Sequence, residues 1–472
     1  MILSIDLGTS KLCAAAIDIE SGRPIAIRSC PNDTEVPGLP DGFHEQDPVR
    51  TRDLCFDLIR QVLGDRAAAG QPVDAIGISG QMHGVLLVDR DLRPLTNLIT
   101  WRDRRTAAEN APGGIGESLS LLGTDVEART GCRLAVGYGG AAIRWLDRNG
   151  LLPARCMALT IAGYIAASLT GIPAIDETHA ASWGVFDVTQ NHWDSDCVSR
   201  LGMRPDVLPA LKLSGEPLGE LTDAAKDALG IHNRAIVCSP VGDCQASIIG
   251  CAGFSADTIV LNVGTGAQIS IPSPDCLYTQ ELDAWPMPFG GFLQLGAVLC
   301  GGWSYAYLRR LFQETAREIC GVELTDEAAY QRMNALAASA QPGAGGLIAD
   351  TRFSGTRKDN TITGSITGID ASNLTPANLS LAILEGIVRE LHSISLTCDK
   401  RNADRLIASG NAVRNNPVLR SVIGRIFDLE CLMSSLPEEA VRGAGYAAAV
   451  GAGLASREDV TALTRRFTEP PT

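Results

Sequence analysis

The sequence predicts an α/β protein built from two similar halves around a cleft. Its 472 residues exceed one usual domain and favour two or three. A strand–turn–strand pattern with the tip D-L-G-T-S at 6–10 recurs as N-V-G-T-G at 262–266, 256 residues later. Elsewhere apolar strand patterns alternate with helical ones. A duplication of this length indicates two related halves and not a solenoid of short repeats.

The elements of the first half follow from local patterns. Apolar residues at 2–5 and 12–18 flank the first tip and predict a β-hairpin. A buried strand is expected at 75–79. Helices are expected over 141–148 and 158–169.

The second half begins with a strand predicted over 235–238, and its own hairpin covers 259–271. Apolar residues at helical spacing between Leu384 and Ile394 predict a helix with one face in the core. A short strand is expected at 405–408, and an Ala- and Gly-rich helix that packs closely is expected at 441–454. No low-complexity linker separates the halves, so we expect a tight hinge between domains 1–234 and 235–472.

Composition and charge exclude several classes of protein. With 45% hydrophobic and 20% charged residues the chain is globular and not disordered. Its net charge of −14 argues against general binding of nucleic acid or anionic membranes. The 14 Cys include no C-x-x-C pair and are expected to be reduced and mostly buried. No apolar run reaches membrane-spanning length, and we expect a cytoplasmic protein.

The two hairpin tips are candidate phosphate sites. Turns rich in Gly and hydroxyls point backbone N–H groups outward, where they can hold phosphate oxygens. Asp6 beside the first tip would suit Mg²⁺, which favours hard oxygen ligands. One such turn alone is more often an ordinary hairpin, but its duplication favours a polyphosphate held from two sides.

Other phosphate-binding classes are excluded by sequence. A P-loop needs Gly-Lys followed by Ser or Thr, and none of the five Lys follows a Gly. A protein kinase needs His-Arg-Asp and Asp-Phe-Gly segments, which are absent from the sequence.

Asp243 is the candidate catalytic base. It follows the predicted strand at 235–238, with Gly242 before it and an apolar helix after it. In such a place a carboxylate can accept the proton of an attacking hydroxyl during phosphoryl transfer. The alternative is a helix N-cap with no catalytic role.

Two polar clusters in the first half could grip a sugar. Gln81, Met82 and His83 follow the strand at 75–79, and Trp101 and Asp103 follow another apolar stretch. A Trp face packs on the apolar side of a polyol, while carboxylates bond to its hydroxyls. Taken singly, His83 is as well explained as a structural histidine and Trp101 as a partly buried core residue.

A third cluster could bind a flat base. Gly410 allows a ring to lie close to the backbone, and Asn411 and Asn415 can bond to the edge of adenine. The alternative is a capped helix start.

The order of these motifs resembles that of the FGGY carbohydrate kinases across essentially the whole chain. The motifs are D-L-G-T-S at 6, G-Q-M-H-G at 80, W-R-D-R-R at 101, G-D-C-Q at 242, N-V-G-T-G at 262 and S-G-N-A at 409. The resemblance implies two ribonuclease-H-like domains of the actin/hexokinase type around a central cleft. It also implies that domain 1–234 binds sugar and domain 235–472 binds nucleotide.

The resemblance further implies a role for each matching residue. Asp243 would be the catalytic base and would also touch the sugar, and both Asp243 and Asp6 would serve Mg²⁺. The sugar pocket would contain Gln81, Met82, His83, Trp101 and Asp103. The residues expected to hold ATP are Gly8, Thr9, Ser10, Gly264, Thr265, Gly266, Gly410, Asn411 and Asn415.

Two departures from the family pattern concern charge. Members usually carry Lys or Arg at the position of Cys13, and Lys11 is the nearest cation that could replace it. The segment after Trp101 usually reads Gln-Asp-Gly-Arg, whereas Arg102 and Arg104 here add two positive charges. These charges could favour an acidic or phosphorylated substrate.

The expected activity is ATP- and Mg²⁺-dependent phosphorylation of a free ketose. The segment A-S-W-G-V-F at 181–186 is similar to that of members acting on sedoheptulose, with xylulose or another pentulose or polyol as the alternative. A homodimer is possible. A non-catalytic sugar-binding regulator is less favoured because Asp6 and Asp243 are both present, and an actin-like filament would leave the sugar clusters unexplained.

Overall fold

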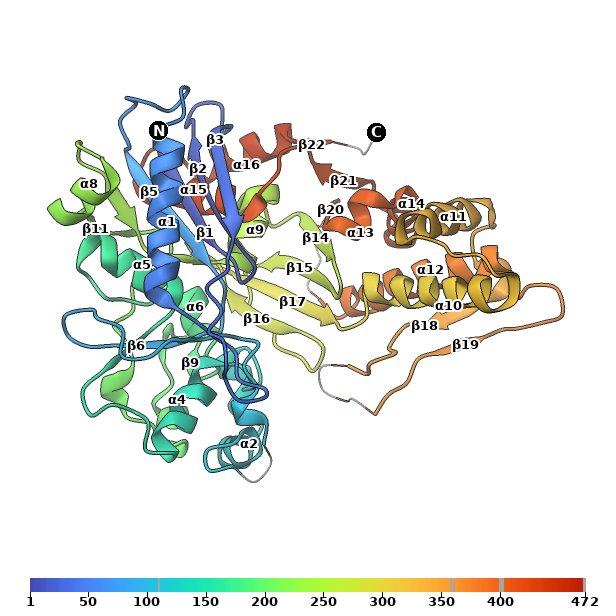
Figure 1. Ribbon diagram of the computed structural model, residues 1–472, viewed down its shortest axis with the longest axis horizontal. Coiled ribbons are helices and arrows are strands. Elements are labelled where there is room, and N and C mark those ends of the chain that lie inside the picture. The colour runs from blue at the N-terminus through green and yellow to red at the C-terminus, as the bar shows by residue number, and fades with distance from the viewer. Residues whose placement is uncertain (109–110, 357–358, 360, 399–402, 470–472) are drawn as a thin grey trace.

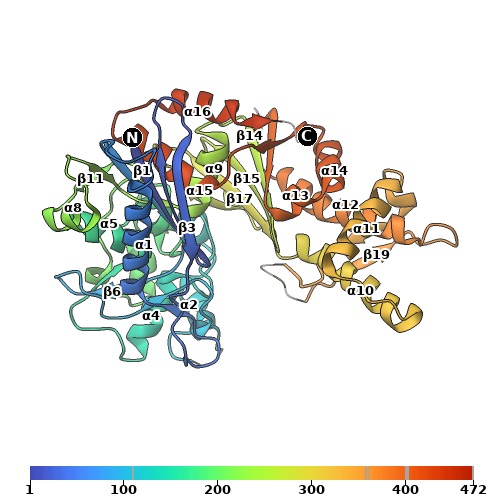
Figure 2. The same cartoon turned by 45° about the horizontal axis from the view of Figure 1, so that its top comes forward.

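The chain forms two α/β lobes that lie side by side (Figure 1). The computed structural model describes residues 1–108, 111–356, 359, 361–398 and 403–469. Figure 2 shows the same two lobes from another direction. Helices α10 (Gly302–Cys320) and α11 (Asp326–Ser339) lie at the outer end of the second lobe. The predicted two-lobed α/β fold is confirmed.

The first lobe is built on a mixed sheet of seven strands within the described residues, in the order β11-β12-β5-β1-β2-β3, with β13 also paired to β5. Strands β1 and β5 are parallel, while β1, β2 and β3 form an antiparallel meander. The strands are β1 (Ile2–Leu7), β2 (Lys11–Ile17), β3 (Pro24–Pro31), β5 (Ala75–Gly80), β11 (Pro217–Glu220), β12 (Ile236–Cys238) and β13 (Val241–Gly242).

The second lobe repeats this arrangement around the second hairpin. Its sheet has the order β16-β17-β15-β14-β20-β21-β22, again with seven strands in the described part of the chain. As in the first lobe, the hairpin strands are antiparallel and the next strand, β20, runs parallel to the first of them. The strands are β14 (Thr258–Val263), β15 (Ala267–Ser273), β16 (Asp283–Pro286), β17 (Phe292–Val298), β20 (Arg405–Ser409), β21 (Cys431–Ser434) and β22 (Thr468–Glu469).

Helices cover both sheets, and short two-stranded pairs lie outside them. The first-lobe helices are α1 (Pro48–Leu63), α2 (Ile115–Leu122), α3 (Glu127–Thr130), α4 (Gly139–Arg148), α5 (Ile161–Thr170), α6 (Glu177–Ala181), α7 (Ser195–Arg200), α8 (Asp223–Leu229) and α9 (Asp243–Ala252). The remaining helices are α12 (Pro376–Ser395), α13 (Asn411–Asn415), α14 (Pro417–Phe427), α15 (Glu439–Gly451) and α16 (Arg457–Arg466). The small pairs are β4 (Glu45–Gln46) with β7 (Leu98–Ile99), β6 (Leu86–Val88) with β8 (Met157–Leu159), β9 (Phe186–Asp187) with β10 (His192–Trp193), and β18 (Ile348–Asp350) with β19 (Ser365–Thr367).

One helix late in the chain returns to the first lobe, although the last described strand, β22, pairs in the second sheet. Helix α15 packs against α9 and against β1 and β5, as its place beside the first sheet in Figure 1 shows. Strand β12 pairs with β5 and β11, so the strand expected to open the second half belongs to the first sheet. The domain boundary predicted at residue 234 is therefore wrong, because it does not separate the strands of the first sheet from those of the second. The change from one sheet to the other falls between Gly242 and Thr258.

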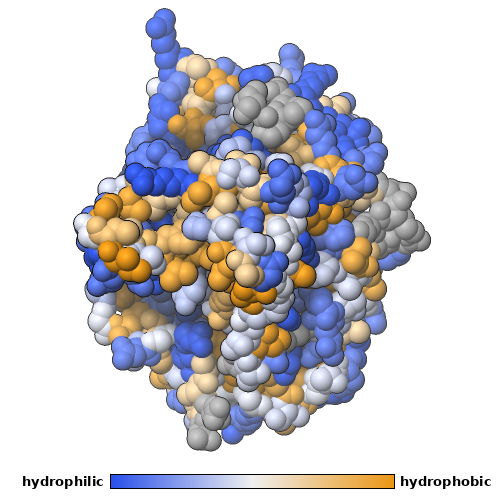
Figure 3. All heavy atoms as spheres, turned by 90° about the vertical axis from the view of Figure 1, so that its right-hand side faces the viewer, coloured by the Kyte–Doolittle hydropathy of each residue, from blue (hydrophilic) through white to orange (hydrophobic). Residues whose placement is uncertain are grey.

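The outer end of the second lobe mixes apolar and polar side chains (Figure 3). Tyr307, Leu311 and Ile319 of α10 are exposed. Among the described helices, none is long and apolar enough to cross a membrane.

Small residues allow α15 to lie very close to its neighbours. A Cβ on Gly443 would come within 1.7 Å of the carbonyl oxygen of Ala246 in α9, and one on Gly77 of β5 within 2.1 Å of the carbonyl oxygen of Ala444. Neither backbone can move without shifting a packed element. The Ala- and Gly-rich composition of α15 is thus a packing requirement.

Gly443→Ala should therefore destabilise the protein by about 1–3 kcal/mol through overpacking. Gly116 in α2 is exposed, and a methyl group added there would meet no other atom within 4 Å. Gly116→Ala is thus the matched control and should be neutral or slightly stabilising. Urea unfolding monitored by circular dichroism measures both. Equal midpoints for the two variants would contradict the close-packing argument.

Candidate active site

The site is built where three parallel strands end side by side. The register pairs Asp6 of β1 with Ser79 of β5, and Gly242 of β13 with Gly80 of β5. The segments that follow the carboxyl ends of these three strands are the first hairpin tip, the Gly80–Gly84 loop and the start of α9. Ligands of open α/β sheets bind at this edge. The topology thus brings three predicted motifs together.

Asp243 is the first residue of α9 and is half-buried. Burial, together with the negative charge of Asp6, raises the pKa of Asp243 to about 7, against a smaller opposing effect from His179. A carboxylate with such a pKa can take up and release a proton near neutral pH. Asp243 therefore has the ionisation expected of a general base.

Helix α6, which sequence reasoning did not single out, holds together the segments that carry Asp243 and His83. The backbone N–H of Gly242 donates to Thr178 Oγ1 at 2.8 Å. The Nε2 of His179 lies 3.2 Å from the carbonyl oxygen of Gly80, and its Nδ1 lies 2.6 Å from Asp176 Oδ2. The backbone N–H of His83 donates to Ser182 Oγ at 2.9 Å. One short helix thus fixes both the base and the predicted sugar loop.

The buried histidine of this helix faces two acceptors. A carboxylate and a carbonyl both need a donor, which favours a ring protonated at both nitrogens. Burial alone would lower the pKa of His179, but the charges of Asp176 and Asp243 raise it overall. Both the two acceptors and the raised pKa favour a positively charged His179 near Asp243.

His83 sits in a strained and well-supported position. Its φ of 71° lies in the left-handed region, which residues other than Gly seldom adopt. Its ring stacks on Tyr138 at 4.3 Å and meets the edge of Trp285 at 5.5 Å between centroids. Trp285 belongs to β16, so this contact joins the first lobe to the second sheet. A backbone strain of this kind, held in place by two aromatic contacts, is typical of a residue whose ring is positioned for a ligand.

The first hairpin tip is tied to the sugar cluster by a chain of hydrogen bonds. Trp101 Nε1 donates to Thr9 Oγ1 at 2.8 Å, and Thr9 Oγ1 donates to Gln81 Oε1 at 3.0 Å. Gln81 Nε2 then donates to Gln46 Oε1 at 2.8 Å. Trp101 is 46% exposed and Gln81 is buried. Trp101 is open to a ligand, whereas Gln81 organises the tip.

The other tip residues share the exposed end of the hairpin. Gly8 accepts a hydrogen bond on its carbonyl from Asn32 Nδ2 at 2.9 Å, and a Cβ there would approach the carbonyl oxygen of Lys11. Ser10 is exposed. The backbone of the tip is held from behind, and its outer face stays accessible.

Two predicted sugar residues are less accessible than expected. Asp103 is 2% exposed, and its oxygens accept from the Arg105 guanidinium at 2.8 Å and from the N–H of His44 at 2.7 Å. Met82 is buried against Gly242. Direct contact of Asp103 with a sugar would require its loop to rearrange.

Asp6 and Asp243 are the carboxylates at this edge that fit a divalent cation. Asp6 Oδ1 accepts from Ser79 Oγ at 2.6 Å, and burial with the nearby Glu438 charge raises the pKa of Asp6. Within the described ranges, no group of three or more His, Cys, Asp or Glu side chains is placed to hold a metal ion alone. This donor set suits Mg²⁺, which usually takes one or two carboxylates together with substrate phosphates.

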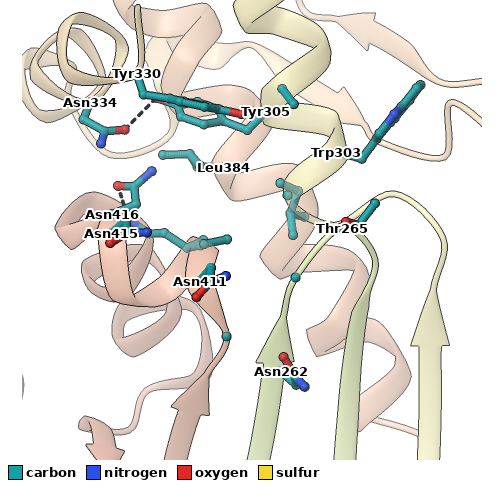
Figure 4. A pocket seen from close by; sticks show the side chains of 17 residues that line it. Asn262, Thr265, Trp303, Tyr305, Tyr330, Asn334, Leu384, Asn411, Asn415 and Asn416 are labelled. Carbon is teal, nitrogen blue, oxygen red and sulfur yellow. Dashed lines mark hydrogen bonds between the residues drawn. The ribbon is translucent and has the colours of Figure 1, made fainter. Parts of the chain in front are cut away.

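The second hairpin tip opens into a cavity of about 670 Å³ in the second lobe. Gly264 and Thr265 of the tip line it, as do Gly410, Asn411 and Asn415 (Figure 4). In Figure 4 Asn411, Asn415 and Asn416 lie on one side of the cavity, and Tyr305 and Tyr330 lie on the other side with Asn334 beside them. Apolar and aromatic walls with a few amides suit a flat heterocycle.

The remaining predicted residue of this tip has a different surrounding. Gly266 accepts on its carbonyl from the N–H of Gly264 at 2.9 Å, and a Cβ there would come within 2.9 Å of the carbonyl oxygen of Val298. It shapes the turn from behind the cavity.

Several cavity residues were not predicted from the sequence. They come from α10, α11, α12 and α14, from the residue before α14 and from β14, and include Trp303, Tyr305, Tyr330, Asn334, Leu384, Ile387, Leu419, Asn416 and Asn262. Tyr330 and Asn334 stand four residues apart on one face of α11, and Tyr305 Oη donates to Asn334 Oδ1 at 3.2 Å. That spacing of aromatic and amide was the available signal.

Known proteins resemble this chain over its whole length. Mouse (Mus musculus) sedoheptulokinase is 28% identical over 465 residues, covering 90% of this chain and 92% of that protein. The structure of xylulose kinase from Rhodospirillum rubrum superposes with a TM-score of 0.87 at 23% identity, covering 100% of this chain and 93% of that one. Plasmodium falciparum glycerol kinase with ADP gives a TM-score of 0.84 at 21% identity, with coverages of 99% and 92%.

These neighbours confirm the predicted pair of actin/hexokinase-type domains. Residues 1–250, more than half of the chain, match the N-terminal domain of the FGGY family of carbohydrate kinases. The match includes the first tip, the Gly80–Gly84 loop and Asp243. The chain belongs to the FGGY family of carbohydrate kinases.

Proposed function

We propose that the protein transfers the γ-phosphoryl group of ATP to the terminal primary hydroxyl of a free ketose, with sedoheptulose as the first candidate and sedoheptulose 7-phosphate as product. The observation that carries the proposal is Asp243, whose pKa is raised to about 7 at the start of α9 beside the first hairpin tip. The similarity to mouse sedoheptulokinase supports the choice of sugar.

In this mechanism Asp243 accepts the proton of the attacking hydroxyl as the phosphoryl group moves in line. Helix α6 holds the base through the hydrogen bond from Gly242 to Thr178. The positive charge on His179 favours the ionised form of Asp243, while burial and Asp6 oppose it. The balance leaves the base active near neutral pH.

The sugar would lie between the Gly80–Gly84 loop and Trp101. The exposed face of Trp101 offers an apolar surface for the carbon backbone of a ketose, and His83 offers a ring held by Tyr138 and Trp285. Gln81 supports this surface through Thr9.

The nucleotide would place its base in the second-lobe cavity beside Asn411 and Asn415, with its phosphates between the two tips. Mg²⁺ held by Asp6, Asp243 and the phosphates would neutralise charge on the transferring group. Closure of the lobes would exclude water, which otherwise competes with the sugar as acceptor.

Xylulose is the second candidate acceptor. The structural likeness to xylulose kinase supports it, and five- and seven-carbon ketoses share the same reacting end. Their discrimination would depend on the residues that contact the carbons farthest from this reacting end.

A coupled assay of ADP release over sedoheptulose, xylulose, ribulose, fructose, glycerol and ribitol tests the proposed acceptor. We expect the highest kcat/KM with sedoheptulose, followed by xylulose. A preference for glycerol or ribitol would overturn the ketose assignment, and no ADP release with any acceptor would overturn the kinase assignment for this set of sugars.

Asp243→Asn should lower kcat by about 10²–10⁴-fold, because the amide cannot accept the proton. Binding of sugar and nucleotide, measured by calorimetry, should change by less than about threefold on the same argument. Asp227→Asn, an exposed charge removed from α8, is the control and should retain activity. Near-normal turnover of Asp243→Asn would show that another group is the base.

The pH profile should show an acidic limb set by Asp243. Its raised pKa of about 7 means that the carboxylate becomes protonated below that pH, so kcat/KM should fall about tenfold per pH unit as pH drops further. Burial also raises the pKa of Glu390 on α12 to about 7, so Glu390→Gln is the matched control and should keep the limb. A flat profile from pH 8 to pH 5.5 would rule out this ionisation as the base.

A further inference from the structure

The first hairpin tip is surrounded by carboxylates. Asp6 and Asp243 lie at the strand ends behind it, and Glu438, just before α15, acts on the pKa of Asp6 through its negative charge. The chain as a whole carries a net charge of −14. A phosphate that reaches this tip therefore needs positive charge from a nearby side chain, in addition to backbone N–H groups and the proposed Mg²⁺.

Lys11 does not provide an uncompensated charge. Its Nζ lies 2.7 Å from both carboxylate oxygens of Glu438. That contact joins the hairpin tip to the start of α15 and neutralises the ammonium. Cys13, two residues further along the strand, is fully buried, and burial raises the pKa of its thiol. Neither side chain offers a free positive charge to an anion at the tip.

Arg102 is a second cation near the tip, and it reaches the tip from the segment that follows Trp101. Its Nη2 is 3.5 Å from Ser10 Oγ, and its guanidinium lies 5.4 Å from the centre of the Trp101 ring. The indole is itself anchored to the tip by its hydrogen bond to Thr9. Arg102 is thus held over the outer face of the hairpin by stacking on a fixed ring.

The acidic partner of Arg102 holds it weakly. Its Nη1 is 3.8 Å from Glu35 Oε1, and the side chains of Arg102 and Glu35 are 41% and 59% exposed. Exposed pairs at such a distance contribute little stability. A phosphate offers stronger, bidentate hydrogen bonds to a guanidinium, so the contact with Glu35 can be exchanged for one.

We propose that Arg102 binds the terminal phosphate oxygens of the nucleotide at the first hairpin tip, and that it is the cation that this tip presents to the transferring group. The proposal rests on the proposed function, because it requires a triphosphate between the two tips. It assigns Arg102 a role in binding phosphate and leaves Lys11 as a tie between the tip and α15.

The test compares Arg102→Gln with Arg104→Gln. Arg104 is exposed two residues further on, with its backbone bonded to the carbonyl of Gly42, so its substitution removes the same charge from the same segment. Binding of the β,γ-imido analogue of ATP and of AMP is measured by calorimetry with sugar and Mg²⁺ present. Kinetic constants for ATP and for sugar are measured in parallel.

We expect Arg102→Gln to weaken binding of the triphosphate analogue by about 10-fold or more, because a hydrogen bond between charged groups is lost. Binding of AMP and KM for the sugar should stay within about twofold of wild type, and Arg102→Lys should recover part of the loss, because a single charge lacks the bidentate geometry. Arg104→Gln should match wild type in every measurement.

Three results would overturn the proposal. These are unchanged binding of the triphosphate analogue by Arg102→Gln, an equal loss for AMP, and a loss confined to KM for the sugar, which would mean that Arg102 contacts the acceptor. The proposed function fails separately, if the wild-type protein binds no adenine nucleotide.

Discussion

The site depends on the hydrogen bonds that α6 makes to two neighbouring strand ends. Thr178 accepts from Gly242, His179 contacts the carbonyl of Gly80, and Ser182 accepts from His83. Because β5 lies between β1 and β13, these bonds fix the distance between the sugar loop, the base and Asp6. The buried pair of His179 with Asp176 is costly to form unless its hydrogen bonds are complete, and here both ring nitrogens have partners. The charge of His179 also acts on Asp243, where it lowers a pKa that burial and Asp6 raise.

The two lobes are joined through α9 and α15, which pack against each other. Helix α15 lies late in the chain but packs on α9 and the first sheet, through contacts too close for any side chain at Gly443. The chain passes from the first sheet to the second after Gly242, so α9 and α15 are the elements next to both crossings. A change in the angle between the lobes must be accommodated at these crossings, because the packed faces themselves cannot deform. Asp243 begins one of these helices, which places the proposed base at the junction of the lobes.

The sequence predicted the repeated hairpins, the strands at 75–79 and 405–408 and the place of Asp243, because each depends on local patterns of apolar residues and Gly. It did not predict what depends on distant pairing. The strand at 236–238 belongs to the first sheet because it pairs with β5 as a parallel neighbour. The helix expected from residue 158 begins at Ile161 because 157–159 pairs with β6. The contacts of α6 were missed for the same reason, since a short helix carries no local mark of its partners. The aromatic wall of the second-lobe cavity left one local signal, the spacing of Tyr330 and Asn334, but its other residues come from distant helices.

Thr9 connects the two substrates that the proposed reaction brings together. Its hydroxyl accepts from the indole N–H of Trp101 and donates its own proton to Gln81, so one atom joins the predicted sugar surface to the phosphate tip. The guanidinium of Arg102 lies over the same ring, 5.4 Å from its centre. A sugar that packs on Trp101 therefore orders the ring on which Arg102 lies, and a phosphate at the tip orders the hydroxyl that holds that ring. Once one ligand has ordered these side chains, the other ligand binds with a smaller loss of conformational entropy. This coupling favours the reaction when both substrates are bound.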